Sequence, residues 1–223
     1  MSEPIAHHHD PKWRRLPEER PRQILEAAIE VFGEHGIAGA KLEEIAARAG
    51  VSKGTIYLYF PSKEDLFREV VRQILVPSIA EVERELVGGS APEQMERYLR
   101  LHWSRFDRPG TAGWVRLVFT ELHRHPDLAQ FYFDEVITKS NRILGDVIRR
   151  GVSLGEFRPL EPVVAISMIK AILLTHVLWS QAPMPSTLGG SRPRGALIDD
   201  IVDFVLHALR PQAAAPVAAP VAE

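Results

Sequence analysis

Residues 41–60 read KLEEIAARAGVSKGTIYLYF, and this stretch decides how the N-terminal third of the chain folds. Apolar residues at helical spacing predict a short helix over 42–49 that stops at Gly50. Ser52 then stands where its hydroxyl can cap a second helix, with Ile56 on the inner side of that helix. Two short helices joined by a glycine-containing turn form a helix-turn-helix pattern.

Longer helices flank this pattern on both sides. Apolar residues at i, i+3, i+4 and i+7 predict a first helix from about residue 18 to 35, with Gly36 at its C-terminal cap. After Pro61, the sequence SKED at 62–65 is similar to a capping box and starts a helix that runs to about residue 86. A compact head of three helices is therefore joined to the rest of the chain by a long helix.

The remaining sequence also has helical periodicity and contains no convincing strand pattern, so the expected fold class is all-α, with about nine helices. The further helices are expected over 92–106, 112–124, 127–150, 162–181 and 195–210. We expect a flexible basic arm, a helix-turn-helix DNA-binding domain, a helical ligand-binding and dimerisation domain, and a disordered Ala/Pro tail. In the same order, these four regions cover residues 1–17, 18–65, 66–210 and 211–223.

The composition of the 223 residues narrows the function classes. A net charge of -2 means that any surface for nucleic acid must be a local one. Without cysteine the chain has no disulfide and no thiol nucleophile, and we expect a cytoplasmic protein. The apolar run at 163–179 contains Lys170 and His176 and is short for a membrane span, so it predicts a buried helix.

The start of the second short helix carries side chains that suit DNA. The hydroxyls of Thr55, Tyr57 and Tyr59 can bond phosphates or base edges. Lys53 adds a positive charge, and Gly54 allows close approach of the backbone. A purely structural role for the two tyrosines is the alternative, and the glycine turn and nearby lysines weigh against it. The pattern therefore predicts a DNA-binding helix.

Residues 21–68 closely resemble the DNA-binding head of the TetR (tetracycline-repressor-like) family of transcriptional regulators. The motifs that carry the resemblance are FGEHGIAGA, IAARAGVSKGT, the Y-x-YF pair and SKEDL. It implies that Thr55, Tyr57 and Tyr59 touch bases and phosphates, and that Lys63 clamps a phosphate. The residues expected at DNA are Lys41, Ser52, Lys53, Gly54, Thr55, Tyr57, Leu58, Tyr59 and Lys63.

Two positions depart from the family's pattern. The family usually has a threonine that caps the helix over 42–49 and meets a phosphate, whereas this chain has Ala40 followed by Lys41. We expect Lys41 to supply a charge contact in its place and the cap to be weakened. Leu58 stands where many relatives carry a polar or aromatic residue, and it can touch a thymine methyl or lie beside the backbone.

The segment KWRRLPEERPR at 12–22 has five basic residues against two acidic ones. It is either a solvated, flexible leader or an arm that follows phosphates or enters the minor groove. A salt titration of DNA affinity with and without residues 1–16 distinguishes these alternatives, because an unchanged salt slope counts against the arm.

Beyond the head the resemblance is looser. It implies an all-helical domain that binds a small molecule and dimerises through its last two long helices, 162–181 and 195–210. The first of these is apolar around much of its circumference, so it must be covered on more than one side. Burial of both helices within a monomer is the alternative. The second helix offers a complementary stripe of Leu197, Ile201, Phe204, Val205 and Leu209.

Aromatic and polar residues of the middle helices can line a ligand pocket, although each taken singly is better explained as a core residue. They favour a bulky, largely apolar effector. Arg142, Arg149 and Arg150 show no inward bias and do not indicate an anionic ligand. The pocket candidates are Trp103, Phe106, Trp114, Phe119, His123, Phe131, Tyr132, Met168 and Trp179.

No motif predicts an enzyme or a metal site. G-x-S-x-G, Walker A, G-x-G-x-x-G and HExxH are all missing, and HRHPD at 123–127 is better explained as a polar helix end. We therefore expect a homodimeric repressor without a cofactor, which binds double-stranded operator DNA of palindromic sequence and is released by a small effector. The alternatives are an activator of the same fold, and a small-molecule-binding adaptor or carrier that has lost DNA binding.

Overall fold

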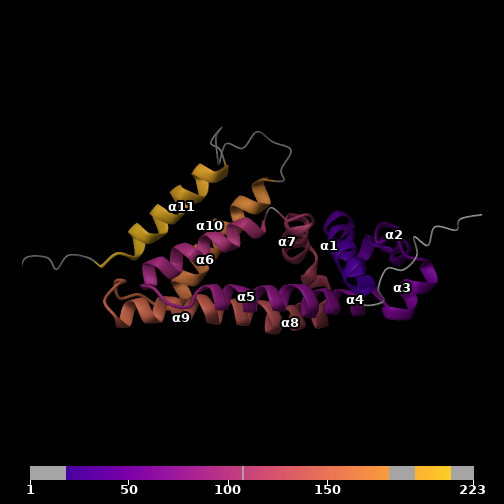
Figure 1. Cartoon of the computed structure of the whole chain (residues 1–223), viewed down its shortest axis with the longest axis horizontal. Coiled ribbons are helices and arrows are strands. Elements are labelled where there is room, and N and C mark those ends of the chain that lie inside the picture. The colour runs from indigo at the N-terminus through magenta and orange to yellow at the C-terminus, as the bar shows by residue number, and fades with distance from the viewer. Residues whose placement is uncertain (1–18, 107, 181–193, 212–223) are drawn as a thin grey trace, which may run out of the picture.

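Two long, segmented helices run along the molecule and set its elongated shape (Figure 1). The computed structural model describes residues 19–106, 108–180 and 194–211. The basic arm and nearly all of the Ala/Pro tail that the sequence predicts lie outside these residues. Every regular element within them is a helix, which confirms the all-α fold class.

The head is built from three helices, and local signals decide where each of them ends. Gly36 has a φ of 70°, so the regular part of the first helix ends at its predicted cap and one irregular turn follows. Gly50 has a φ of 66°, a left-handed conformation that favours glycine at the turn of the helix-turn-helix. The three helices are α1 Glu19–Gly39, α2 Leu42–Arg48 and α3 Lys53–Tyr59.

Each long helix of Figure 1 consists of two α-helices with a π-helical segment between them. The first comprises α4 Lys63–Val70, the π-helical segment Val71–Leu75 and α5 Val76–Glu85. The second comprises α8 Pro126–Tyr132, the π-helical segment Phe133–Thr138 and α9 Lys139–Ser153. The two π-helical segments contact each other. When each of these two segmented helices is counted once, the described residues form nine helices, in agreement with the sequence.

The other helices of the body lie within a few residues of the predicted bounds. A capping box starts the first of them, because the Ser90 N–H donates to the Glu93 carboxylate at 2.7 Å and the Ser90 hydroxyl accepts from the Glu93 N–H. These elements are α6 Ala91–Arg105, α7 Thr111–Thr120, a 3-10 turn Leu122–Arg124, α10 Pro162–Ser180 and α11 Arg194–Leu209.

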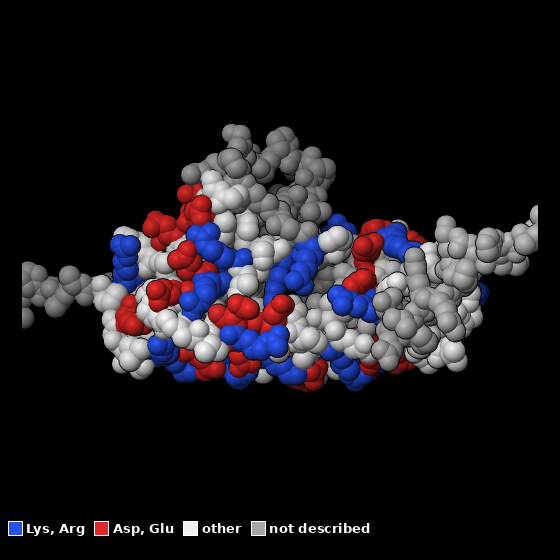
Figure 2. Space-filling view, in the orientation of Figure 1, with Lys and Arg blue, Asp and Glu red and all other residues white. Residues whose placement is uncertain are grey.

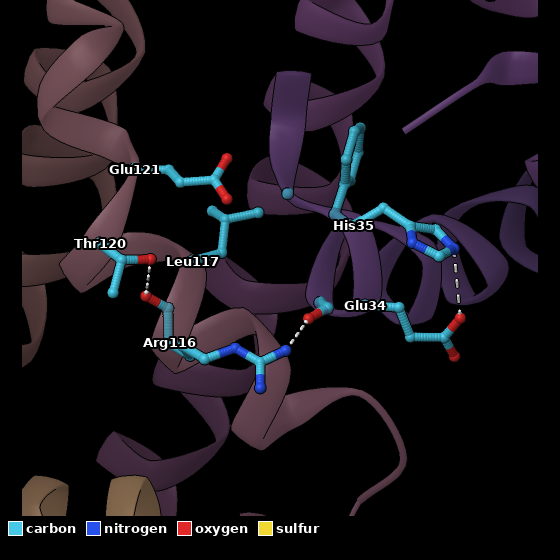
Figure 3. A pocket seen from close by; sticks show the side chains of 9 residues that line it. Glu34, His35, Arg116, Leu117, Thr120 and Glu121 are labelled. Atoms are coloured by element: carbon cyan, nitrogen blue, oxygen red, sulfur yellow. Dashed lines mark hydrogen bonds and ion pairs between the residues drawn. The ribbon is translucent and has the colours of Figure 1, made fainter. Parts of the chain in front are cut away.

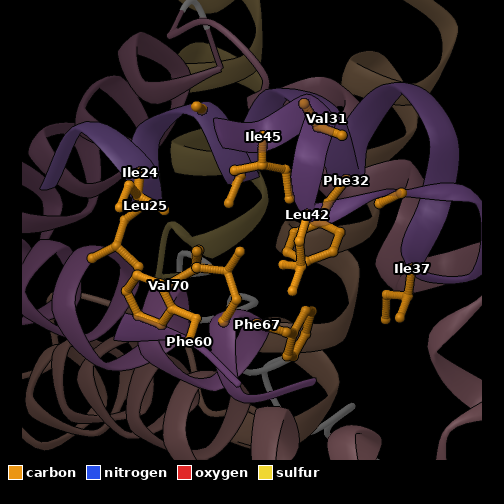
Figure 4. Packing of buried hydrophobic residues seen from close by; sticks show 14 of the residues in the cluster. Ile24, Leu25, Val31, Phe32, Ile37, Leu42, Ile45, Phe60, Phe67 and Val70 are labelled. Carbon is orange, nitrogen blue, oxygen red and sulfur yellow. The ribbon is translucent and has the colours of Figure 1, made fainter. Parts of the chain in front are cut away.

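The core of the head continues into the body. Buried residues of α1, α2 and α4 form one cluster (Figure 4), and α7 and α8 add to it. The Trp114 ring of α7 stacks on Phe67 of α4 with a centroid distance of 4.9 Å, and Phe32 of α1 meets Trp114 edge-on at 6.4 Å. The hydrophobic core is therefore continuous across the expected domain boundary between residues 65 and 66.

The last two helices bury one side each and leave apolar side chains exposed on another. In α10, Ile169 and Leu173 are buried, whereas Met168 is 63% exposed. The apolar stripe predicted on α11 packs mostly within its own chain, since α11 lies on α6, and only Phe204 stays largely exposed, at 64%. Among the described residues, no helix is both long and apolar enough to cross a membrane.

Candidate DNA-binding and ligand-binding sites

The rotation of α3 is set by one cap and one buried side chain. The Ser52 hydroxyl accepts from the Thr55 N–H at 3.1 Å, as the sequence predicts, and lies 2.8 Å from the Thr55 hydroxyl oxygen. Ile56 is fully buried among the head residues. Because these two contacts hold α3, Thr55 is half-buried and the remaining residues of the helix face solvent.

The residues that α3 presents are those expected at DNA. Leu58 is 80% exposed, Tyr57 and Tyr59 are about 40% exposed, and Lys53 lies exposed at the first position of α3. A Cβ added to Gly54 would meet only the Ser52 hydroxyl, at 3.8 Å. The exposed face of α3 is therefore accessible to the surface or groove of a binding partner.

The two flanking lysines differ in how they are held. Lys41 is the N-cap residue of α2, is exposed and makes no side-chain cap bond, so the cap is weakened as expected. Ala40, by contrast, is buried. The Lys63 ammonium donates to the Ala38 carbonyl at 2.9 Å, which places it at the junction of α1 and α4.

Glu43 of α2 holds two of the predicted DNA-contacting side chains. Its carboxylate accepts from the Lys53 ammonium at 2.9 Å and from the Tyr57 hydroxyl at 3.1 Å. The hydrogen bond from Lys53 is the main reason why the pKa of Glu43 falls to about 2. Glu43 therefore stays ionised at any working pH and engages both donors in the DNA-free protein. Sequence reasoning missed this contact, because the partners lie on different helices.

Glu43→Gln is expected to tighten DNA binding roughly two- to fivefold, because an exposed ion pair of this kind is weak and its loss frees Lys53 for phosphate. The increase should be similar for operator and unrelated DNA, since a phosphate contact carries no sequence information. Anisotropy titrations with both DNAs measure it. Weaker binding of Glu43→Gln would show instead that Glu43 positions the two donors for DNA.

A set of ion pairs braces α2 against α1. The Arg48 guanidinium donates to both Glu34 carboxylate oxygens, at 2.6 and 2.8 Å. His35 Nε2 lies 3.0 Å from a Glu44 carboxylate oxygen. Glu34, His35 and Glu44 are close enough to share a cation, but Arg48 also lies 3.6 Å from Glu44 and already offsets one of the two carboxylate charges. The geometry indicates a structural brace.

The head and the body meet at a small polar cavity of about 120 Å³ between α1 and α7 (Figure 3). Arg116 of α7 donates to the Gly33 carbonyl at 2.6 Å, and the Ile37 N–H donates to the Glu121 carboxylate at 3.1 Å. Gly33 and Gly113 lie in backbone contact, because a Cβ on Gly113 would be 2.7 Å from the Gly33 Cα. These contacts tie the end of α1 to α7.

A second cavity, of about 190 Å³, lies between α5, α6 and α9 at the other end of the body. Gln94 lines it and donates to the Leu86 carbonyl at 2.6 Å, while Arg150 donates to the Gln94 side-chain oxygen at 2.9 Å. None of the pocket candidates predicted from the sequence lines either cavity.

The structure does not gather those pocket candidates into one site. Trp103 and Phe106 pack in the core of the body, where the Trp103 ring stacks on His176 at 4.5 Å. Trp114, Phe131 and Tyr132 pack in the core shared with the head. The remaining candidates are Phe119, His123 and Met168, which are exposed, and Trp179, whose side chain lies outside the described residues.

Charges on the visible face of the molecule are mixed in sign. Figure 2 shows Lys and Arg interspersed with Asp and Glu along this face. Attraction to a polyanion must therefore come from a local group of cations, as the net charge of -2 also requires.

Two family models match the chain. The model described as bacterial regulatory proteins, tetR family, matches residues 24–70, which run from α1 to the end of α4. The model described as tetracyclin repressor-like, C-terminal domain, matches residues 88–205. The second match alone spans more than half of the chain.

Similar proteins are transcriptional regulators. The repressor KstR2 of Mycolicibacterium smegmatis is 30% identical over 145 residues, which are 64% of this chain and 70% of that protein. The regulator RutR of Escherichia coli K12 is 28% identical over 211 residues, 90% of this chain and 95% of the relative. The crystal structure of the transcriptional regulator FadR from Bacillus subtilis in complex with stearoyl-CoA is 25% identical, with a TM-score of 0.68, and covers 85% of this chain and 99% of FadR.

Proposed function

This chain belongs to the tetR family of bacterial regulatory proteins, and from that premise we propose that it is a homodimeric repressor whose α3 helices bind a palindromic operator and which a small effector releases. The observation that carries the proposal is the exposed face of α3, where Lys53, Tyr57 and Tyr59 stand on a helix fixed by its cap and by Ile56. The chain is a regulator and not an enzyme, like its relatives.

The test is a gel-shift titration against DNA that flanks the protein's own gene, at two salt concentrations and beside a scrambled competitor. Sequence-selective binding that saturates at one dimer, or a pair of dimers, per site supports the proposal. If neither this titration nor selection from random-sequence DNA yields a selective site, the adaptor or carrier alternative replaces the repressor proposal. Salt dependence alone does not distinguish them, because phosphate contacts dominate non-specific affinity.

The dimer is proposed to form through α10 and α11. Its support is a set of apolar side chains that a single chain leaves exposed on these two helices: Val163, Val164, Met168 and Phe204. Burial of such a surface against a second copy is favourable by about 25 cal/mol per Å². A two-fold dimer also places two α3 helices at half-sites one or more helical turns apart.

Met168→Glu is expected to convert the dimer to a monomer and to lower operator affinity strongly, because the carboxylate would be desolvated at the interface. Light scattering after size exclusion measures the mass. Leu154→Glu is the matched control, since Leu154 is 57% exposed but follows α9 and lies on neither interface helix. A Met168→Glu protein that remains dimeric contradicts this interface.

The effector is proposed to bind in the body and to act through the contacts that join α7 to α1 and α4. A ligand that favours another position of α7 would change the spacing of the two heads and so weaken their match to two half-sites. The Phe67–Trp114 stack and the Glu121–Ile37 bond support this route, since both cross the joint. The bound stearoyl-CoA of FadR supports a bulky effector with a long apolar part.

A further inference from the structure

Among the described residues of the body, Lys170 is half-buried beside apolar core side chains. Lys170 lies on α10, next to Ile169 and three residues before Leu173, and both of these neighbours are buried. Its ammonium donates to the Asn141 side-chain oxygen at 2.5 Å and to the Ser140 hydroxyl at 3.1 Å, both on α9. In the sequence, Lys170 indicates only that 163–179 is not a membrane span.

No carboxylate of the described residues lies within ion-pair distance of Lys170, which distinguishes it from the neighbouring cations. Lys139 pairs with Glu135, and Arg105 pairs with Glu81 at 3.1 Å. Burial lowers the pKa of Lys170 to about 8, and no neighbouring opposite charge raises it. A partly buried cation held only by neutral oxygens is poorly compensated until an anion joins it.

Two side chains of α6 bring further polar atoms to this place. The Tyr98 hydroxyl is buried without a well-formed hydrogen bond, and burial raises the pKa of Tyr98 to about 12, although the nearby Ser140 hydroxyl opposes this shift. The His102 ring stacks on Tyr98 at 4.3 Å, and its Nδ1 is buried without a well-formed bond. Burial, with the charges of Arg105 and Lys170, lowers the pKa of His102 to about 3, so the ring is neutral.

We propose that Lys170, Ser140 and Tyr98 form an anion subsite that binds the carboxylate of an apolar acid, and that this acid is the effector. The three groups come from α10, α9 and α6 and share one location, with donors for a carboxylate and no acid among them. The surrounding residues of the same core are apolar and suit the rest of the ligand. The inference rests on the proposed function and specifies the effector as an amphipathic acid.

The test uses two dyes of nearly the same shape on the full-length protein: anionic 8-anilino-1-naphthalenesulfonate, whose sulfonate stands in for the carboxylate, and its uncharged analogue N-phenyl-1-naphthylamine. Lys170→Met is expected to weaken binding of the anionic dye by about tenfold or more and to change the Kd of the neutral dye less than about twofold. Decanoate should displace the anionic dye from the wild type, and methyl decanoate should not.

The matched control is Lys139→Met, which removes a charge from the same region but leaves Lys170 in place. It should bind both dyes as the wild type does. The inference is overturned if the wild type does not bind the anionic dye, if Lys170→Met binds it equally well, or if acid and ester displace it equally.

A second measurement guards against misfolding of the variant. Lys170→Met should raise the melting temperature of the ligand-free protein, because it removes a partly buried cation without a counter-ion, whereas loss of a merely structural lysine would lower it. Operator binding is measured in parallel. A wild type that binds operator but shows dye binding independent of Lys170 overturns the anion subsite alone, and a protein without any selective DNA site overturns the proposed function.

Discussion

Tyr57→Phe combined with Lys63→Ala is expected to reduce operator affinity by a factor of about 100 or more, with the fold intact. Each substitution acts once in each half-site, so a dimer loses four contacts. Neither side chain belongs to the core, because the Tyr57 hydroxyl donates only to Glu43 and Lys63 to the Ala38 carbonyl. Anisotropy titration at fixed salt measures the affinity, and circular dichroism the melting temperature.

The control for this pair is Arg149→Ala. Arg149 is an exposed cation that pairs with Asp146 on α9, far from the head in Figure 1, so its loss should leave operator affinity unchanged. The slope of log affinity against log salt should fall by about one for each lost lysine–phosphate contact. If the double variant binds its operator as the wild type does, α3 is not the DNA-reading helix.

Gly113→Ala is expected to destabilise the protein by about 1–3 kcal/mol, since the added methyl group overpacks the joint between α1 and α7. A Cβ at this position would lie 2.7 Å from the Gly33 Cα and 2.8 Å from the Gly33 carbonyl oxygen. Backbone atoms cannot relieve this clash by a change of rotamer, so the two helices must move apart. Chemical denaturation followed by circular dichroism measures the loss.

The same substitution should uncouple the head from the effector, because it disturbs the Arg116–Gly33 bond without touching α3. Operator binding should persist while its release by the effector weakens. Gly195→Ala is the matched control, since a Cβ at Gly195 meets no atom within 4 Å, so alanine there should not destabilise the protein. Equal stability of the two variants would contradict the close contact at Gly113.

The sequence by itself determined the elements, because their signals are local. Helical periodicity, the Ser52 cap and the left-handed glycines at 36 and 50 all act within one or two turns of chain. The exposed face of α3 followed in the same way, since burial of Ile56 decides which of its neighbours face solvent. None of these conclusions required knowledge of which helices pack together.

Only the tertiary structure decided which distant residues meet. Glu43 pairs with donors 10 and 14 positions away on another helix, and Trp114, a pocket candidate by composition, joins Phe67 in the core between head and body. Lys170 likewise acquires its polar surroundings from α6 and α9. Such contacts depend on helix packing, and an aromatic or a charged side chain has the same local signature whether it lines a pocket, fills a core or faces water.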